Sequence, residues 1–422
     1  MPTSELALLG GPKTRTAPFP PYPVIGDEER RAVMEVLDEG RLSTFIASPG
    51  ELFLGGKRIR AFERAFADAH GVRFAVAFNS ATSALHAAVV ALDVPPGHEV
   101  LVPPYTFTST ATCTLMAGAV PVFVDVEPET FCLDPKALEA ALSPLSRAVI
   151  PVHLFGHPAP MDEIMDVARR HSLRVIEDAA QAPGAVYRGR PVGTLGDCAV
   201  YSFQESKNLM TGEGGMLITD DPQVAEVAQL VRNHGEMIEE ASTRRTYRSE
   251  ILGYGYRMTE FEAALGLVQL GRLPAQNAAR QRLAGHLTRA LAGVPGLQPP
   301  VVRPGCEHVF YAYALTYDEA AWGVPRDRFV AALQAEGVPA GPGYVKPLYL
   351  NPLYAERRSW AFSAYRGGAR YERGICPVAE DLHFQKVVVL AVVRPPASER
   401  DMDDVAAAVH KLWAHRAELA RC

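Results

Sequence analysis

Residues that could do chemistry together follow two short apolar runs in the middle of the sequence. Asp178 and Gln181 come directly after the run 173–177, and Lys207 follows the run 198–203, 29 residues after Asp178. In an open α/β sheet, ligands bind at the carboxyl ends of the strands, where such residues lie. A lysine amine forms a Schiff base with an aldehyde cofactor, and a carboxylate keeps a pyridine nitrogen protonated so that the ring accepts electrons. The residue types and their positions therefore predict a site for pyridoxal 5'-phosphate (PLP).

The phosphate of such a cofactor needs a binding site of its own, and the segment 79–83 offers one. Its sequence, Asn-Ser-Ala-Thr-Ser, opens a predicted helix, and a helix start with hydroxyls and free backbone amides binds anions. Taken singly, each signal has an ordinary explanation: Asp178 and Ser80 as helix caps, 212–215 as a tight turn, and Lys207 as a surface lysine. Their combination in one chain favours the PLP site.

The elements that must position these residues form an α/β pattern. From about residue 75 to residue 220, apolar and β-branched runs alternate with amphipathic stretches of helical length, which predicts a parallel or mixed sheet covered by helices. Several runs are apolar on both faces, as in buried strands. The predicted strands are 99–102, 120–126, 148–153, 173–177, 198–203 and 216–219, and the predicted crossover helices are 83–92, 135–141, 161–171 and 222–231.

The C-terminal part of the sequence predicts a second, smaller α/β domain. Helical periodicity over 260–273 and 278–292, interrupted at Pro274, indicates a connection out of the large domain. We therefore predict an N-terminal arm and large domain at 1–273, and an interdomain helix and small domain at 274–422. Within the small domain we expect a strand at 308–315, helices at 326–336 and 398–419, and a loop rich in Pro, Gly and Tyr at 339–354.

A proline-rich segment, Pro-Phe-Pro-Pro-Tyr-Pro, occupies 18–23. It could act as a polyproline ligand for a partner domain. Because it lies close to the start of the fold, packing against the body of the chain or against a second subunit is the favoured interpretation.

Composition and charge exclude several classes of function. The 422 residues include 48 acidic and 42 basic side chains, so the net charge of −6 leaves no basic surplus for nucleic acid. The N-terminus lacks the features of a signal peptide and the apolar run 387–393 is too short to span a bilayer, so we expect a cytoplasmic protein with no membrane contact. The six cysteines are widely spaced and form no CxxC pair, so neither a metal site nor a disulfide framework is predicted.

Four motifs together resemble the DegT/DnrJ/EryC1/StrS aminotransferases. They are Glu-Asp-Ala-Ala-Gln-Ala at 177–182, Ser-Phe and Lys at 202–207, Gly-Glu-Gly-Gly at 212–215, and Tyr-Gly-Tyr-Arg-Met-Thr-Glu at 254–260. The likeness extends over nearly the whole chain. It implies a fold type I PLP-dependent transferase, with a mostly parallel sheet in the large domain and a smaller C-terminal α/β domain. It also implies a homodimer with active sites at the subunit interface, and amination of keto groups on sugars or cyclitols.

The resemblance assigns the central roles to three residues. Lys207 would form the Schiff base and move the proton between cofactor and substrate. Asp178 would pair with the pyridinium nitrogen. Gln181 would hydrogen-bond the phenolic oxygen of the cofactor, although a surface amide on the following helix is the alternative for this position.

Further roles implied by the resemblance fall on the cofactor's phosphate and ring. Ala81 and Thr82, where the family usually has Gly-Thr, would bind the phosphate, with Ser202 as a further donor. Phe107 would stack on one face of the ring and Ala180 would pack on the other. An ordinary core position is the alternative for Phe107, since an aromatic residue at a strand end is often buried.

Two residues near the predicted site are given minor roles. His153, at the end of the predicted strand 148–153, is expected to be a buried and hydrogen-bonded histidine, because Lys207 already supplies the base. Glu213 is expected to position its loop rather than to contact substrate.

Three departures from the family pattern bear on the substrate. Gln204 stands where members acting on nucleotide-linked keto-sugars commonly have His, and Tyr349 stands where they tend to have His in Pro-Leu-His. Both are more similar to the branch of scyllo-inosose aminotransferases and 3-amino-5-hydroxybenzoate synthases, which favours a free cyclitol or similar polyhydroxy ketone. Gly255 stands where the family usually has an Asn that reaches the partner subunit's phosphate, so that contact loses one hydrogen bond, or about 1 kcal/mol. Compensation by Tyr254 or Tyr256 and a closer approach of the backbone at the glycine are the open alternatives.

The sequence thus predicts an aminotransferase that moves an amino group from L-glutamate or L-glutamine to a keto-cyclitol or keto-sugar, in the biosynthesis of aminosugars, aminocyclitols or other secondary metabolites. A dehydrating aromatase like 3-amino-5-hydroxybenzoate synthase and a catalytically inactive scaffold are the alternatives. Sugar dehydratases of the family replace the lysine with His, so Lys207 argues against that branch. We expect the substrate pocket to be formed by the segments 344–354, 45–53 and, from the partner chain, 244–249.

Overall fold

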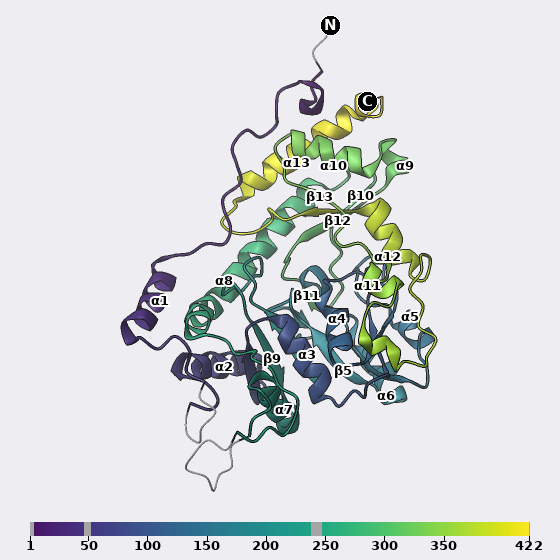
Figure 1. Cartoon of the computed structure of the whole chain (residues 1–422). Coiled ribbons are helices and arrows are strands. Elements are labelled where there is room, and N and C mark those ends of the chain that lie inside the picture. The colour runs from purple at the N-terminus through teal and green to yellow at the C-terminus, as the bar shows by residue number, and fades with distance from the viewer. Residues whose placement is uncertain (1–3, 46–51, 238–246, 422) are drawn as a thin grey trace.

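The computed structural model describes residues 4–45, 52–237 and 247–421. A seven-stranded sheet forms the centre of the large domain (Figure 1). Strand β9 runs antiparallel to both of its neighbours and the other adjacent pairs are parallel, so the sheet is mostly parallel. The strand order is β1 (Phe74–Phe78), β9 (Gly215–Thr219), β8 (Cys198–Ser202), β5 (Arg174–Asp178), β4 (Ser146–Val149), β2 (Glu99–Val102) and β3 (Val120–Phe123).

Helices cover this sheet and complete its core. β2, β8 and β9 are buried at every position, which is why their sequences are apolar on both faces. The helix α3 (Ala81–Ala91) packs across β8 and β9 and against α7. The other helices of this domain are α2 (Lys57–His70), α4 (Ser109–Met116), α5 (Pro135–Ala140), α6 (Met161–His171) and α7 (Pro222–Arg232).

A second sheet and a separate hydrophobic core lie in the C-terminal part of the chain. The sheet order is β10 (Leu297–Gln298), β12 (Tyr313–Tyr317), β14 (Val387–Leu390) and β13 (Gly341–Pro342). The helices α10 (Arg326–Ala335) and α13 (Glu399–Ala414) contribute to its core. Residues as late as Leu382 and Val387 nevertheless pack into the core of the large domain. The domain division at residue 273 stays a prediction.

The helix α8 (Glu260–Ala290) corrects the expectation of two helices separated at Pro274, because it is continuous through that residue. It begins with a capping box in which Thr259 and Glu262 exchange hydrogen bonds. Packing against α1 (Asp27–Glu39), α2 and α13 supports both halves of the helix, so one missing backbone donor does not break it.

Some predicted boundaries were also wrong at strand and helix ends. The predicted strand 308–315 is shifted to β12 at Tyr313–Tyr317, and the predicted terminal helix 398–419 divides into α13 and α14 (Arg416–Leu419). The strand predicted at 120–126 ends at Phe123. Within the described part of the chain, no helix combines the length and apolar character that crossing a bilayer requires.

Candidate active site

A cavity of about 540 Å³ opens beside the carboxyl ends of β5 and β8. All eight residues predicted for the site line it: Ala81, Thr82, Phe107, Asp178, Ala180, Gln181, Ser202 and Lys207. These residues come from segments spread over more than 120 positions of the sequence. The parallel strands bring them to one edge of the sheet, as the fold class requires.

Asp178 is the last residue of β5 and its carboxylate is buried at the wall of the cavity. Its Oδ2 accepts a hydrogen bond from the Thr110 hydroxyl at 2.8 Å, and its Oδ1 accepts one from the Ala180 backbone N–H at 3.1 Å. Burial raises the pKa of Asp178 above its ordinary value, although these two hydrogen bonds and the positive charge of Lys207 oppose the shift. The carboxylate therefore has few donors for its degree of burial.

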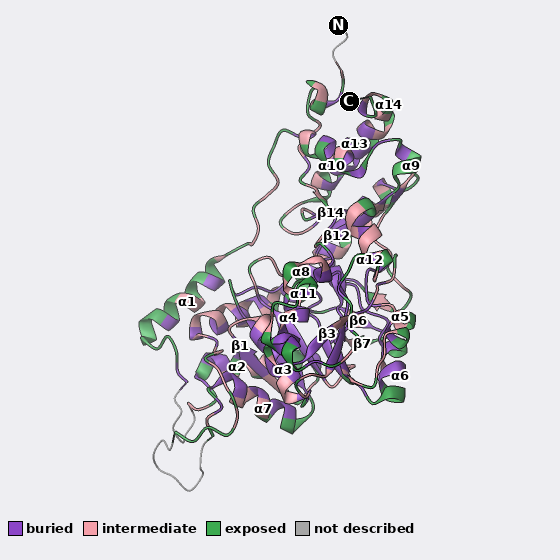
Figure 2. Ribbon diagram, turned by 45° about the vertical axis from the view of Figure 1, so that its right-hand side comes forward, coloured by how far each residue is buried: buried purple, intermediate pink, exposed green. Residues whose placement is uncertain are grey.

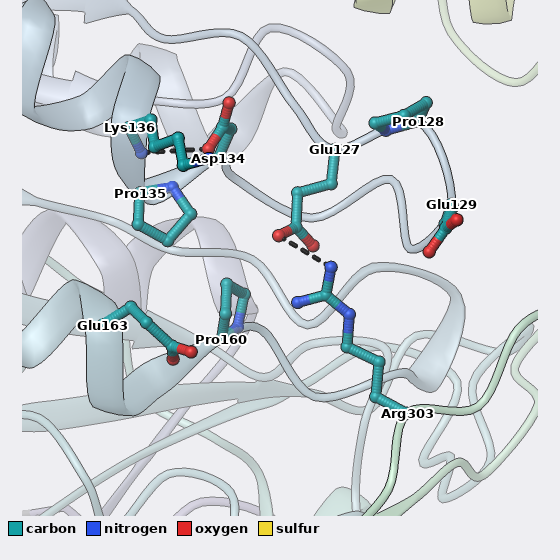
Figure 3. A pocket seen from close by; sticks show the side chains of 9 residues that line it. All are labelled: Glu127, Pro128, Glu129, Asp134, Pro135, Lys136, Pro160, Glu163 and Arg303. Atoms are coloured by element: carbon teal, nitrogen blue, oxygen red, sulfur yellow. Dashed lines mark hydrogen bonds and ion pairs between the residues drawn. The ribbon is translucent and has the colours of Figure 1, made fainter.

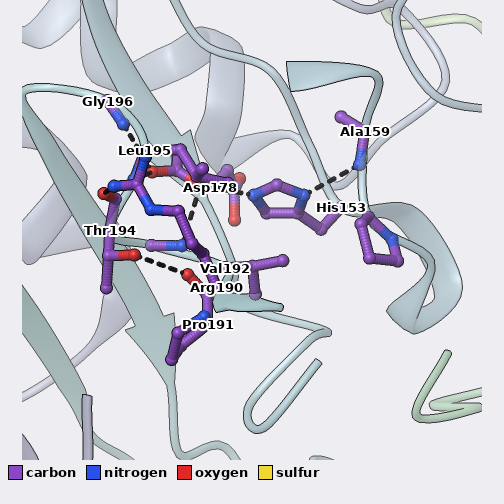
Figure 4. Close-up of polar contacts among 12 residues, drawn as sticks. His153, Ala159, Asp178, Arg190, Pro191, Val192, Thr194, Leu195 and Gly196 are labelled. Carbon is purple, nitrogen blue, oxygen red and sulfur yellow. Dashed lines mark hydrogen bonds and ion pairs between the residues drawn. The ribbon is translucent and has the colours of Figure 1, made fainter. Parts of the chain in front are cut away.

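Glu177 precedes Asp178 on β5, and it is the neighbouring carboxylate with a full set of donors. Figure 4 shows that Leu195, Gly196 and His153, which come from separate segments, lie close to the end of this strand at Asp178. The backbone N–H groups of Gly193, Leu195 and Gly196 donate to Glu177 at 2.6 to 2.7 Å. His153 Nε2 lies 3.0 Å from its Oε2. These groups come from the segment that follows the hairpin of β6 (Val186–Tyr187) and β7 (Arg190–Pro191) and from the end of the loop after β4.

His153 is fully buried and bonded at both ring nitrogens, as expected for a residue without a catalytic role. The Ala159 backbone N–H donates to Nδ1 at 2.9 Å, so Nε2 carries the proton and donates to Glu177. Burial raises the pKa of Glu177, but the hydrogen bonds from His153, Gly193 and Gly196 outweigh burial and hold it below the ordinary value. Glu177 is thus a stable buried anion.

Gln181 is a buried residue of the cavity wall, which excludes the alternative of a surface amide. Its Oε1 accepts a hydrogen bond from the Phe155 backbone N–H at 2.8 Å, and its Nε2 donates to the Tyr344 hydroxyl at 2.9 Å. The backbone donor fixes the orientation of the amide, because an N–H group can only donate. No other described residue bonds to Nε2, so one of its N–H groups remains for a ligand.

The N-terminus of α3 forms another wall of the cavity. Ser80 caps the helix by accepting from the Ser83 backbone N–H, and the Thr82 hydroxyl lies 2.7 Å from that of Ser109. The backbone N–H groups of Ala81 and Thr82 have no intramolecular partner among the described residues. A helix start with free amides binds anions such as phosphate.

Gly215, from the Gly-rich motif, is needed for close packing against this helix start. A Cβ at Gly215 would lie 2.5 Å from the carbonyl carbon of Ser80 and 2.6 Å from the Ala81 nitrogen. Any side chain there would displace the backbone that carries the free amides. The motif thus shapes the anion site as well as making a turn.

Lys207 lies in the irregular connection between β8 and β9 and lines the cavity. Its Nζ is 4.4 Å from the centre of the Tyr311 ring, and no hydrogen bond or ion pair engages Nζ within the described part of the chain. Ser206 lies beside it, with its hydroxyl 3.1 Å from the Tyr311 hydroxyl and 2.6 Å from Gln204 Oε1. The amine is therefore available to a ligand.

Phe107 is 58% exposed, so the alternative of an ordinary core position is excluded. Ala180 and Ser202 line the same cavity, and so do Glu213 and Gln204. The sequence interpretation missed Thr110, Ser109 and Tyr311, which the cavity also includes. Thr110 had a signal, since it follows Phe107 by one helical turn, whereas Tyr311 lay within a predicted strand and had none.

The predicted substrate-pocket segments are only partly supported. In the segment 344–354, Tyr344 lines the cavity, but Tyr349 and Tyr354 are buried against Phe123. Those two rings pack in the core because the segment turns back onto the large domain after Tyr344. In the predicted segment 45–53, Phe45 is buried beneath Arg232, and 46–51 lie outside the described residues, as do 244–246 of the third segment.

Gly255 has space for a side chain within its own chain. An added Cβ would lie 3.5 Å from the His234 ring, which is an ordinary contact distance. The neighbouring rings of Tyr254 and Tyr256 stack on each other at 4.9 Å, and both contact the His86 ring. No close contact within this chain therefore requires a glycine at position 255. The effect of Gly255 on a contact with a partner subunit stays a prediction.

An open hollow of about 430 Å³, whose lining side chains Figure 3 shows, shares no residue with the cavity. Glu127 in this hollow already pairs with Arg303 at 2.9 Å and accepts from the Thr130 hydroxyl. Asp134 caps α5 through the Lys136 backbone N–H. These carboxylates serve the local structure, so the hollow is no rival to the cavity around Lys207.

Comparison with known proteins defines the class of this chain. Residues 25–410 match the DegT/DnrJ/EryC1/StrS aminotransferase family. The GDP-perosamine synthase of Caulobacter vibrioides is 42% identical over 335 residues, which cover 79% of this chain and 85% of that protein. The L-glutamine:2-deoxy-scyllo-inosose aminotransferase of Streptomyces fradiae is 37% identical over 429 residues, with 99% of each chain covered.

The crystal structure of 3-amino-5-hydroxybenzoic acid synthase superposes with a TM-score of 0.80 at 29% identity, covering 96% of this chain and 99% of that chain. The chain belongs to the DegT/DnrJ/EryC1/StrS aminotransferase family. The predicted fold type I architecture and the predicted enzyme class, an aminotransferase, are confirmed.

Proposed function

We propose that this protein is a PLP-dependent aminotransferase that transfers an amino group from L-glutamine or L-glutamate to a keto-cyclitol or keto-sugar. The observation that carries the proposal is one cavity lined by an unpaired amine, a buried carboxylate and a helix start with free amides. An amine, an acid and an anion site are the three groups that a pyridoxal phosphate requires of its protein.

The residues present fit this cofactor. Among the described residues, the buried Asp178 carboxylate has two donors, which suits it to accept a further hydrogen bond from a protonated ring nitrogen. The free amides of Ala81 and Thr82, with the Thr82 and Ser202 hydroxyls, suit a phosphate. The free N–H of Gln181 suits the phenolic oxygen. Phe107 and Ala180 offer apolar contacts for the two faces of a ring.

PLP, when bound, acts as an electron sink that allows the bond between the amino-acid α-carbon and its hydrogen to break. Lys207 would hold the cofactor through Nζ and would carry the proton from that carbon to C4′ of the cofactor, first as general base and then as general acid. Asp178 holds the proton on the ring nitrogen. Tyr311, whose ring lies 4.4 Å from Nζ, limits the positions open to the amine.

Support for the substrate comes from relatives. The Streptomyces fradiae relative, whose name gives L-glutamine as donor and 2-deoxy-scyllo-inosose as acceptor, covers nearly all of both chains. Gln204 also lines the cavity and agrees with the cyclitol branch. A free keto-cyclitol with L-glutamine as donor is therefore our first choice. A GDP-linked keto-sugar is the second candidate, because the GDP-perosamine synthase has the higher identity.

The homodimer is part of the proposal. The helix α1 lies at the edge of the chain (Figure 2). Five apolar side chains on α1 or next to it are 42 to 53% exposed: Val24, Ile25, Met34, Leu37 and Leu42. Exposed apolar groups in such number support an interface with a second subunit. The cytoplasmic location stays a prediction.

The first test is an absorption spectrum of the wild type and of Lys207→Ala, each with PLP and then with L-glutamine or L-glutamate. We expect the wild type to show a visible band from cofactor bound covalently to lysine, which the donor converts to the near-ultraviolet band of the aminated cofactor. Lys207→Ala is expected to lack the visible band and to lose at least about 10³-fold in turnover, because the residue has both roles.

Absence of the visible band in the wild type would contradict the proposal and favour an inactive scaffold. If the band forms, the converted enzyme is offered 2-deoxy-scyllo-inosose, scyllo-inosose and a GDP-linked keto-sugar. The acceptor that restores the visible band fastest defines the substrate class. Appearance of an aromatic product instead would favour the dehydrating aromatase.

A further inference from the structure

The segment 4–26, here called the N-terminal strap, crosses from the small domain to α1 along the outside of α8 (Figure 1). Its first half is held on the small domain, where Glu336 accepts from the backbone N–H groups of Ala7 and Thr14 at 2.9 Å. Arg15 also pairs with Asp401 at 2.7 Å.

The strap is fixed at its other end as well. The Gly26 backbone N–H bonds to Glu29 Oε2 at 2.8 Å, and Glu29 Oε1 pairs with Arg272 on α8 at 2.6 Å. The proline-rich segment 18–23 lies between the two anchors and packs against the body of the chain, which agrees with the favoured interpretation of that motif over a polyproline ligand.

Tyr22, in the proline-rich segment, contacts the backbone of Lys207. Its hydroxyl donates a hydrogen bond to the Lys207 carbonyl oxygen, across 185 positions of the sequence. Its ring lies 4.0 Å from the guanidinium carbon of Arg394 and 5.4 Å from that of Arg280. Neither arginine pairs with a carboxylate in the described part of the chain; Arg280 donates to the Phe310 carbonyl at 3.3 Å, and both cations lie beside the electron-rich ring. The two cations hold the ring, and thereby its hydroxyl, in place.

The backbone around Lys207 depends on such side-chain contacts. It belongs to neither a helix nor the central sheet, so regular hydrogen bonding does not fix it. The Lys207 backbone N–H donates to the Gln204 carbonyl at 2.8 Å, and Asn208 Nδ2 bonds to Asn277 and to the Val309 carbonyl. In the described residues, Tyr22 is the group that satisfies the Lys207 carbonyl.

We propose that Tyr22 is a positioning residue for Lys207: by holding the lysine's carbonyl oxygen, the N-terminal strap sets where the amine enters the cavity. The inference rests on the proposed function of Lys207. A long, flexible side chain reaches a defined place only if its backbone is fixed, and catalysis is steeply sensitive to displacements of about 1 Å.

The test compares Tyr22→Phe with Tyr317→Phe in the full-length protein. Both substitutions remove one tyrosine hydroxyl that bonds to a backbone carbonyl, since Tyr317 donates to the Val324 carbonyl at 2.6 Å. Tyr317 lies in the small-domain core, packed against Trp322 and Phe329. Phenylalanine keeps the ring in both places. The two variants therefore differ in which carbonyl loses its hydrogen bond, that of Lys207 or that of Val324.

The measurement is the rate at which saturating L-glutamine or L-glutamate converts the visible band, together with the donor concentration at half-maximal rate. We expect Tyr22→Phe to lower the maximal rate by about tenfold while the half-saturating concentration changes less than about twofold. Tyr317→Phe is expected to keep the wild-type rate. The thermal midpoints of both variants and their visible bands show that each is folded and loaded.

Equal rates for the two variants and the wild type would overturn the role of Tyr22 while leaving the proposed function intact. A parallel rise in the half-saturating concentration would also overturn it, because that result indicates a role in donor binding. Failure of the wild type itself to form a visible band would contradict the proposed function, so the two failures are distinguishable.

Discussion

Two neighbouring carboxylates on β5, Glu177 and Asp178, are equally buried but point to opposite sides of the strand. On one side, three backbone N–H groups and His153 converge on Glu177, and its pKa lies below the ordinary value. On the other, Asp178 has a hydroxyl and one backbone N–H, and its pKa lies above the ordinary value. Burial is thus accompanied by a lowered pKa at Glu177 and by a raised pKa at Asp178.

The difference shows how a buried charge can be structural or functional. A carboxylate whose donors are complete is satisfied and holds surrounding segments together, whereas one whose donors are incomplete retains affinity for a charged ligand. For Glu177, the held segments are the one that follows β7 and the loop after β4. Asp178 lines the cavity, as Lys207 does, so a ligand bound there can supply a further donor to its carboxylate.

The largest effect is expected for Asp178→Asn. The amide cannot keep a ring nitrogen protonated, so the rate of the donor half-reaction should fall by about 10³-fold. The cofactor-free protein should keep its stability or gain slightly, because the substitution removes a buried charge with few donors. The half-reaction is followed by the visible band, and stability by urea unfolding without PLP. A strong loss of stability with an intact rate would reverse the assignment.

Glu177→Gln is the matched change on the other side of the strand. The glutamine offers a single acceptor oxygen, and its NH₂ group faces N–H donors, so the free energy of unfolding should fall by about 3 kcal/mol. The rate per folded molecule should change by less than about threefold, since the cavity wall keeps its own groups. Urea unfolding measures the first quantity and the band conversion the second. A catalytic loss as large as that of Asp178→Asn would refute the contrast.

The two carboxylates should also differ in the sign of their pH dependence. Because the pKa of Glu177 is lowered, its stabilising effect is complete above the ordinary value of 4.5 and is lost as the pH falls through the lowered value. Because the pKa of Asp178 is raised, its cost is absent below the ordinary value of 3.8, grows as the pH rises from 3.8 to the raised value, and is constant above it. As the pH rises from 3 to 7, the free energy of unfolding of Glu177→Gln should therefore fall further below that of the wild type. That of Asp178→Asn should instead rise relative to the wild type. Unfolding curves of all three proteins measure both differences.

The sequence predicted one member of this pair far better than the other. Asp178 follows an apolar run, at the place where parallel strands present ligand-binding residues, and the family motif includes it. Glu177 belongs to the same motif, but its donors lie 16 to 19 residues later and at His153, so only the folded chain shows that they converge. Its structural role could not be predicted from spacing.

The same limit explains the other omissions. The central strands follow from local apolar patterns, so most were predicted within a few residues. The contact from Tyr22 to Lys207 depends on how the strap lies across two domains, which no local pattern records. Continuity of α8 through Pro274 likewise depends on helices that pack along both of its halves.

The smallest effect is expected for Thr110→Val, which removes one of the two donors of Asp178 and keeps the shape of the side chain. Losing that hydrogen bond leaves the carboxylate harder to ionise, so the rate of the donor half-reaction should fall by about tenfold, or about 1.4 kcal/mol.

Thr114→Val is the control for this change. Thr114 is also fully buried on α4, one helical turn later, but its hydroxyl donates to the Ala111 carbonyl instead of a carboxylate. If both variants slow the donor half-reaction equally, the loss comes from a disturbance of α4 and not from Asp178. If only Thr110→Val loses rate, and raises the pH needed for full activity, the hydroxyl acts through Asp178. The second outcome would show that the donors of Asp178 are few but not dispensable.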